Sequence, residues 1–162
     1  PLRKPSEPTV FETRPATGAP NKRALRLFYS YASEDKTLFQ ELEQHLIPLK
    51  RQGLIDGWHR GNIKAGLIDT EETPSHFQAA DLIVLLLSKS YLASDRCVGE
   101  MEQAMQYQRH KTTRVVPVLL SDCLWESTPV SATRIVPQDG TPLTTLPNRD
   151  AAWKEIAAEI LA

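Results

Sequence analysis

The chain of 162 residues lacks several features that identify common functional classes. No apolar run approaches the roughly 18 residues of a membrane-spanning helix. The N-terminus also lacks the apolar core of a secretory signal peptide. The net charge of -1 lacks the basic excess that is typical of nucleic-acid-binding domains. We therefore expect a protein whose partners are neither a membrane nor a nucleic acid.

Metal and phosphate-binding motifs are missing as well. The four histidines and the two cysteines, Cys97 and Cys123, have no metal-ligand spacing. No Gly-rich phosphate loop of either common kind is present. We read both cysteines as free thiols in a reducing compartment, which predicts a cytoplasmic protein. No histidine is placed by the sequence to activate Cys97, so packing is its expected role.

Proline is concentrated at the N-terminus. Residues 1–23 carry five of the twelve prolines and almost no periodic apolar pattern. This composition is typical of extended, poorly packed chain, and we interpret it as a linker or a disordered tail. Because the chain begins at Pro1 rather than Met, we expect it to belong to a longer protein. The folded domain is expected at 24–162.

From Ala24 onward, strand and helix patterns alternate. The alternation predicts an α/β domain with right-handed crossovers. We expect a flavodoxin-like three-layer fold with a five-stranded parallel sheet in the order 2-1-3-4-5. Its third strand is the most apolar run of the chain, as expected for a central strand covered on both faces. The five strands are expected at 25–30, 54–58, 82–87, 114–120 and, more briefly, 134–136.

Prolines and glycines set the expected helix limits. Pro48 and Gly53 are expected to end the first helix. Pro74 suits the first turn of the second helix, with Thr73 as its cap. The third helix is expected at about 94–110.

The predicted strand order locates a binding crevice. In doubly wound sheets, ligands bind beyond the carboxyl ends of the strands where the order reverses. In the order 2-1-3-4-5 that point lies between the first and third strands. Side chains of the two loops that leave these strands, together with the start of the third helix, are expected to line the crevice: Tyr31, Ser33, Ser88 and Tyr91.

The third helix brings a carboxylate to the border of this crevice. On a helical wheel with its apolar arc centred on Met101, Glu100 and Glu102 fall on opposite borders, each about 100° away. Either residue is compatible with an ordinary solvated carboxylate. Periodicity alone does not choose between them.

Several segments, in order along nearly all of the folded region, share motifs with one family. They are the first strand and its exit at 27–35, the loop region 57–66, the third strand at 79–88, the segment 91–97, the helix start at 97–101, and the tail segments 117–120, 137–142 and 148–153. On these segments residues 24–161 resemble a bacterial TIR (Toll/interleukin receptor) domain. The region from Gly57 to Gly66 resembles the BB loop of that family.

The resemblance implies an activity and a catalytic residue. The segment from Cys97 to Met101 resembles the Cys-x-x-Glu-Leu segment of the family, whose glutamate is catalytic in TIR enzymes, and this role falls on Glu100. The implied reaction is cleavage of NAD+ at the nicotinamide–ribose bond, giving ADP-ribose or a cyclic isomer. NAD+ is then the substrate, and no cofactor is expected.

The resemblance also implies partners. In the family, the BB loop of one subunit completes the site of its neighbour. We therefore expect activation by self-association through residues 59–66. A fused sensor or oligomerisation domain and a role in bacterial immune signalling are expected on the same basis.

Binding of NAD+ requires donors for the diphosphate and partners for the ribose. Arg60 and Lys64 are candidates for the diphosphate, although such residues are more often solvated loop charges. Ser33 and Ser88 are candidates for ribose or phosphate, with helix capping and strand termination as the alternatives. Cys97 is a further candidate at the substrate site.

Flat faces for the rings of NAD+ are less obvious. Some bacterial TIR enzymes carry a Trp one turn before the catalytic glutamate, where this chain has Asp95, Arg96 and Cys97. Stacking is therefore expected from Tyr31, Tyr91 or Trp58, although partial burial beside its strand is the favoured interpretation of Trp58. Turnover is expected to be low without assembly.

Two further classes of function stay open. A TIR adaptor without enzymatic activity would scaffold partners through the BB loop and helix faces. An N-glycosidase for free nucleotides or nucleosides would use a similar sheet and a carboxylate. A scaffold has no need of a carboxylate at the crevice, so Glu100 separates the first alternative from NAD+ cleavage. Fold class alone decides none of these.

Overall fold

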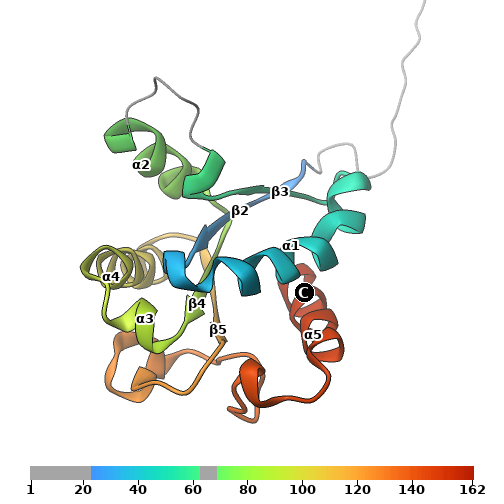
Figure 1. Cartoon of the computed structure of the whole chain (residues 1–162). Coiled ribbons are helices and arrows are strands. Elements are labelled where there is room, and N and C mark those ends of the chain that lie inside the picture. The colour runs from blue at the N-terminus through green and yellow to red at the C-terminus, as the bar shows by residue number, and fades with distance from the viewer. Residues whose placement is uncertain (1–22, 63–68) are drawn as a thin grey trace, which may run out of the picture.

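The computed structural model describes residues 23–62 and 69–162, which form an α/β domain (Figure 1). Four parallel strands are hydrogen-bonded in the order β3-β2-β4-β5. This is the predicted order 2-1-3-4, and the reversal between the first and third strands is confirmed. The strands are β2 (Leu25–Ser30), β3 (Ile55–Trp58), β4 (Leu82–Leu87) and β5 (Arg114–Leu119).

The predicted fifth strand is reduced to an isolated bridge among the described residues. Val136 lies parallel to Val118 beside β5. The Leu119 N–H donates to the Val136 carbonyl, and the Val136 N–H donates to the Pro117 carbonyl, both at 2.9 Å. Because the Pro117 carbonyl faces this edge, its ring nitrogen faces the same edge and offers no donor for a longer ladder. The ladder between β5 and β4 therefore loses no bond to this proline.

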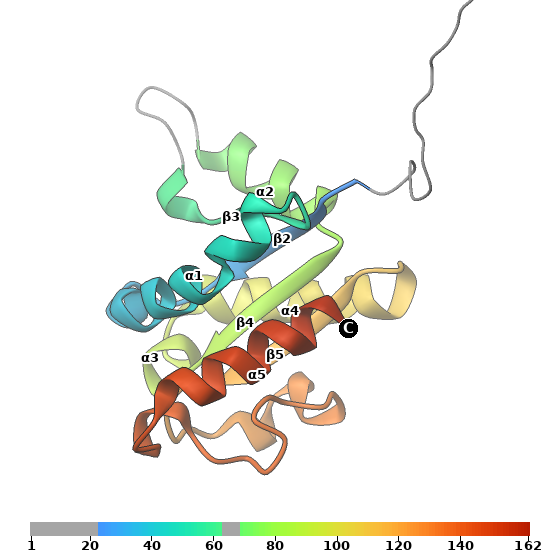
Figure 2. The ribbon, with the colours of Figure 1, turned by 90° about the vertical axis from the view of Figure 1, so that its right-hand side faces the viewer.

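Helices cover both faces of the sheet. On one face lie α1 (Lys36–Arg51) and α5 (Arg149–Leu161), and on the other lie α2 (Asp69–Ala79) and α4 (Asp95–His110). Figure 2, viewed from the side of α1 and α5, shows these two helices in front of the strands. The three-layer arrangement is the predicted one.

The central strand β4 has a hydrophobic layer on each side. All six of its side chains are fully buried. Leu82, Val84 and Leu86 pack toward α1 and α5, whereas the alternate residues pack toward α2 and α4. The continuous apolar pattern predicted this double burial, because successive side chains of a strand point to opposite faces.

The helix α1 passes through Pro48, so the prediction that this residue ends the helix is wrong. The helix continues to Arg51, and Gly53 follows with a positive φ of 73°. A proline inside a helix costs about 3 kcal/mol, since it removes one hydrogen bond and crowds the preceding turn. Burial of Phe39, Leu42 and Leu46 against the sheet offsets that cost.

The start of α2 also differs from the prediction. The helix begins at Asp69, so Pro74 lies inside it rather than in its first turn. Phe77 packs edge-on against Phe28 of β2, with ring centroids 4.8 Å apart. This tertiary contact holds the helix despite its proline. The helix α4, at Asp95–His110, agrees with the predicted 94–110.

Parts of two predicted segments lie outside the described residues. Of the predicted linker 1–23, only Arg23 is described, and its guanidinium holds Asp81 at 2.7 and 2.9 Å. This pairing lowers the pKa of Asp81 to about 2. Of the loop 59–66, residues 59–62 are described. Within the described residues no helix has the length and apolar character needed to cross a membrane.

Candidate functional site

A buried carboxylate lies where the carboxyl ends of β2 and β4 meet the start of α4. Ser94 caps α4, since its hydroxyl accepts from the Cys97 N–H at 3.2 Å. Glu100 follows in the second turn and is 9% exposed. The neighbouring Glu102 is exposed to solvent. The structure thus separates two carboxylates that the helical wheel left equivalent.

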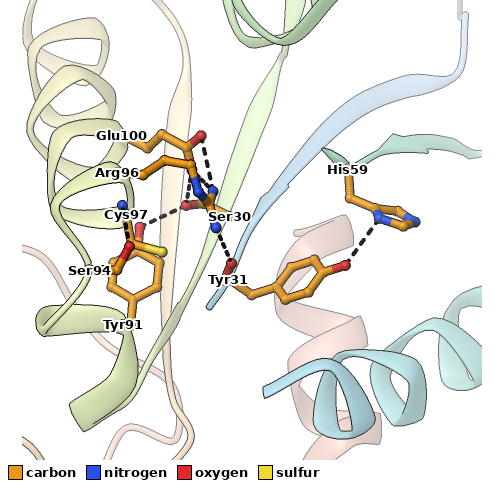
Figure 3. Close-up of polar contacts among 8 residues, drawn as sticks. All are labelled: Ser30, Tyr31, His59, Tyr91, Ser94, Arg96, Cys97 and Glu100. Carbon is orange, nitrogen blue, oxygen red and sulfur yellow. Dashed lines mark hydrogen bonds and ion pairs between the residues drawn. The ribbon is translucent and has the colours of Figure 1, made fainter. Parts of the chain in front are cut away.

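Two hydroxyl groups hold Glu100 in place (Figure 3). The Ser30 hydroxyl, at the end of β2, donates to Oε1 of Glu100 at 2.6 Å. The Tyr91 hydroxyl lies 2.8 Å from the same serine oxygen. Because a carboxylate only accepts, Ser30 donates its proton to Glu100 and accepts from Tyr91. Burial raises the pKa of Tyr91 well above its usual value, so the phenol stays a donor.

Arg96 lies one turn before Glu100 and faces the same carboxylate. Its Nη1 is 3.4 and 3.5 Å from the two carboxylate oxygens. Its Nη2 donates to the backbone carbonyl of Tyr31 at 3.2 Å. The Arg96 side chain is 38% exposed, against 10% for the Glu100 side chain. The guanidinium therefore lies on the solvent side of the carboxylate.

Tyr31 connects this cluster to the start of the loop 59–66. Its ring stacks on Phe39 with centroids 4.3 Å apart, and its hydroxyl lies 3.1 Å from Nδ1 of His59. The same Nδ1 accepts from the Gly61 N–H at 3.0 Å and is therefore unprotonated. Burial lowers the pKa of His59 and thereby favours the neutral ring, whereas the nearby Glu43 carboxylate acts in the opposite direction.

Two adjoining cavities form the predicted crevice. The inner cavity, of about 120 Å³, contains Glu100. The outer cleft, of about 640 Å³, is open to solvent. Ser33 and Arg96 line both, so Arg96 lies at the junction between them. The inner cavity is lined by Phe28, Tyr29, Tyr31, Ser33, Arg96 and Glu100, and the outer cleft by Ala32, Ser33, Glu34, Lys89, Ser90, Ala93, Ser94 and Arg96.

Three predicted site residues are buried and line neither of these two cavities, so the expectation that Ser88 and Tyr91 line the crevice is corrected. Ser88 is 2% exposed, and its hydroxyl donates to Asp35 and accepts from the Tyr91 N–H, which caps the short helix α3 (Lys89–Leu92). Tyr91 is fully buried and presents its hydroxyl to Ser30. Cys97 is fully buried in the hydrophobic layer on the α4 side of the sheet.

Of the remaining predicted residues, Trp58 is not brought to Glu100. Trp58 lies in another cavity, of about 260 Å³, between β3 and α2, where its ring stacks on His76 at a centroid distance of 4.4 Å. Arg60 belongs to the short helix at Arg60–Asn62, and its side chain is outside what the structure describes. Lys64 lies outside the described residues altogether.

Sequence reasoning missed Ser30 and Arg96 as members of the site. Ser30 is the last residue of a strand whose exit was expected at the crevice, so its position was a usable signal. Arg96 precedes Glu100 by four residues, a spacing at which helical side chains are neighbours. Sequence analysis treated Arg96 only as a departure from the Trp found in some relatives.

A family model of the TIR domain matches residues 27–156. The chain therefore belongs to the TIR domain family, as its motifs predicted. An uncharacterized protein of Sinorhizobium fredii, y4lF, is 36% identical over 135 residues. The match covers 83% of this chain and 42% of that relative, so the chain spans less than half of its length.

Solved TIR domains share the fold at low sequence identity. That of the Toll-related receptor TRR-2 from Hydra magnipapillata has a TM-score of 0.57 and 13% identity, over 84% of this chain and 98% of that one. The TIR domains of the activated Roq1 resistosome give 0.55 and 19%, over 85% and 84%. The RPS4 and RRS1 TIR heterodimer gives 0.53 and 16%, over 85% and 96%.

Proposed function

We propose that this TIR domain cleaves NAD+ at the bond between nicotinamide and ribose. The observation that carries the proposal is the buried Glu100 carboxylate, which Ser30 holds in a pocket beyond the carboxyl ends of β2 and β4. A buried carboxylate is costly unless it is hydrogen-bonded. Its position at the point of strand reversal is where ligands of this fold class bind.

The chemistry requires one carboxylate. The electron pair of the bond between C1′ and the ring nitrogen leaves with the nicotinamide, which neutralises the pyridinium, so the leaving group needs no proton. Positive charge develops on the ribose, and Glu100 stabilises it or attacks C1′. Water then adds at C1′ and releases one proton, which gives ADP-ribose. Attack by an atom of the adenine base gives a cyclic isomer instead.

The two cavities divide the substrate between them. The inner cavity of about 120 Å³ suits the ribose next to nicotinamide, and the outer cleft of about 640 Å³ suits the rest of the dinucleotide. Ser33 is exposed at the junction and Lys89 is exposed along the outer cleft. Both are donors for a diphosphate or a ribose hydroxyl.

Self-association through the loop 59–66 belongs to the same proposal. The RPS4 and RRS1 TIR domains form a heterodimer, so association between two TIR domains has a precedent that supports this part of the proposal. The greater length of the Sinorhizobium relative leaves room for a fused sensor or oligomerisation domain. Activation by self-association predicts that NAD+ cleavage rises more steeply than in proportion to the protein concentration.

The test compares two carboxylates on one helix. NAD+ consumption and nicotinamide release are measured at high protein concentration for the wild type, Glu100→Gln and Glu102→Gln. We expect Glu100→Gln to lose at least about 100-fold in kcat. The exposed Glu102→Gln is the matched control and should keep wild-type activity.

Other outcomes point to the other classes. Absence of turnover in all three proteins, also when they are crowded into assemblies, would favour a scaffold without enzymatic activity. Release of bases from nucleosides with NAD+ left intact would favour an N-glycosidase. Activity that survives in Glu100→Gln would contradict the assignment of the carboxylate.

A further inference from the structure

We propose that Arg96 is a plug that closes the Glu100 pocket in this conformation, and that it must move away before a substrate cation can bind. This inference rests on the proposed function. Arg96 is a positioning residue here, because it acts on the reacting carboxylate rather than on the substrate.

The place of the guanidinium is the first argument. Nη1 of Arg96 lies 3.4 and 3.5 Å from the two oxygens of Glu100, while Nη2 donates to the Tyr31 carbonyl at 3.2 Å. The group thus spans from α4 to the end of β2 and forms part of the wall of the inner cavity. It also lines the outer cleft, so it lies between that cleft and the Glu100 carboxylate.

Charge is the second argument. The nicotinamide ring of NAD+ is a cation, and the charge that develops on the ribose during cleavage is also positive. An arginine keeps its charge at any physiological pH. A guanidinium in contact with the Glu100 carboxylate therefore neutralises it and weakens its attraction for both the bound ring and the developing cation. In this arrangement Glu100 is held in position, but its negative charge is compensated by Arg96 instead of by the substrate.

The contacts of Arg96 are also easy to break. Its distances to Glu100 exceed the 2.7 to 2.9 Å or so of a strong charged hydrogen bond. Ser30, in contrast, meets the same carboxylate at 2.6 Å. The Arg96 side chain is 38% exposed, so its guanidinium can rotate into the outer cleft. That rotation leaves the hydrogen bonds from Ser30 to Glu100 and from Tyr91 to Ser30 in place.

The backbone of Tyr31 is the second holding point, and it suggests how the plug is released. The Tyr31 carbonyl accepts from Arg96, and the Tyr31 hydroxyl meets His59 at the start of the loop region. A displacement of His59 that carries Tyr31 with it removes one of the acceptors of Arg96. The carboxylate and the loop are thus connected through one residue.

Binding of nicotinamide riboside tests the plug without depending on turnover. This probe has the cationic ring and the ribose but no phosphate, so diphosphate contacts do not contribute. We expect Arg96→Gln to bind it about tenfold more tightly than the wild type, as expected from the removal of one adjacent charge. A tenfold change in Kd corresponds to about 1.4 kcal/mol.

Two controls separate charge from space. Arg96→Lys keeps the positive charge and should bind nicotinamide riboside about as weakly as the wild type. The reduced riboside, whose ring is neutral, should gain less than the cation from Arg96→Gln. Thermal unfolding checks the fold of each variant, and Arg96→Met replaces Arg96→Gln if the latter is destabilised.

The outcomes distinguish the plug from the proposed function. Equal or weaker binding of nicotinamide riboside by a well-folded Arg96→Gln would overturn the plug, and so would undetectable binding by both proteins. Tighter binding together with a higher kcat for NAD+ in dilute solution would support it. Tighter binding without any cleavage of NAD+ would support the plug and count against the proposed function alone.

Discussion

At the scale of single residues, Ser30 is the centre of the site. It is 1% exposed and joins two groups from different helices, accepting from Tyr91 and donating to Glu100. A chain of hydrogen bonds that is satisfied at each step fixes the carboxylate in one orientation. The strand end therefore orients a side chain that belongs to a helix 70 residues further along the chain.

Replacing Ser30 by Ala should cost both stability and activity. The change removes the acceptor of the buried Tyr91 hydroxyl and the shortest hydrogen bond of the Glu100 carboxylate. We expect a loss of about 1 to 3 kcal/mol in the free energy of unfolding, because buried polar groups without partners carry a desolvation penalty. For the proposed cleavage of NAD+ we also expect kcat to fall at least about tenfold, since a misplaced carboxylate would react slowly.

Urea unfolding and nicotinamide release measure these two effects. The matched control is Ser33→Ala, because Ser33 is exposed at the same crevice. Its stability should stay within about 0.5 kcal/mol of the wild type. An unchanged stability of Ser30→Ala would show that the hydrogen-bond chain does not hold the site together.

At the scale of elements, α1 and α5 are fastened together by one carboxylate. Glu41 of α1 accepts from two nitrogens of Arg149 at 2.9 and 3.0 Å and from the Trp153 indole at 2.9 Å. The pairing with Arg149 lowers the pKa of Glu41, with the Trp153 indole contributing in the same direction. This contact fixes the layer of helices behind β2, and thereby the strand that ends at Ser30.

Removing this carboxylate should loosen the layer. We expect Glu41→Ala to lower the free energy of unfolding by about 1 to 2 kcal/mol, since the buried indole N–H loses its acceptor while the half-exposed ion pair adds little. Urea denaturation provides the measurement. Glu155→Ala, which removes an exposed carboxylate from α5, should change the stability by less than about 0.5 kcal/mol. Similar losses in the two variants would count against a specific role of Glu41.

At the scale of the whole molecule, His59 connects the site to the pH dependence of folding. Burial lowers its pKa in the folded protein, Glu43 opposes this shift, and Lys50 and Lys36 add to it. The unfolded chain therefore binds a proton more readily than the folded one. By linkage, stability is fully present above the ordinary value of 6.5 and falls as the pH drops below it.

Chemical unfolding at several pH values from about 5 to 8 tests this sign. We expect the free energy of unfolding of the wild type to decrease on acidification through this range, and His59→Gln to show a flatter profile. A glutamine keeps an acceptor for the Gly61 N–H but does not titrate. An identical slope in both proteins would assign the pH dependence to other groups.

Elements with a strong local pattern were predictable from the sequence. The strands and their order follow from the alternation of apolar segments, and the limits of α4 follow from its capping serine. The limits of α1 and α2 were not predictable, because Pro48 and Pro74 are tolerated where packing against the sheet outweighs a lost hydrogen bond. The fifth strand is shortened for the opposite reason, since Pro117 offers no donor and leaves only an isolated bridge at Val136 among the described residues.

The sequence by itself determined the family and the strand order, and through a motif it favoured Glu100 over Glu102 as the candidate catalytic residue. Each of these follows from short motifs and from the succession of strand and helix patterns along the chain. Only the tertiary structure decided that Glu100 is buried while Glu102 is solvated, that Ser30 holds the carboxylate, and that Trp58 lies in another cavity. The physical reason is distance along the chain: the contact of Ser30 with Glu100 spans 70 residues and that of Arg96 with Tyr31 spans 65. Such contacts exist only once the sheet has brought the ends of β2 and β4 together.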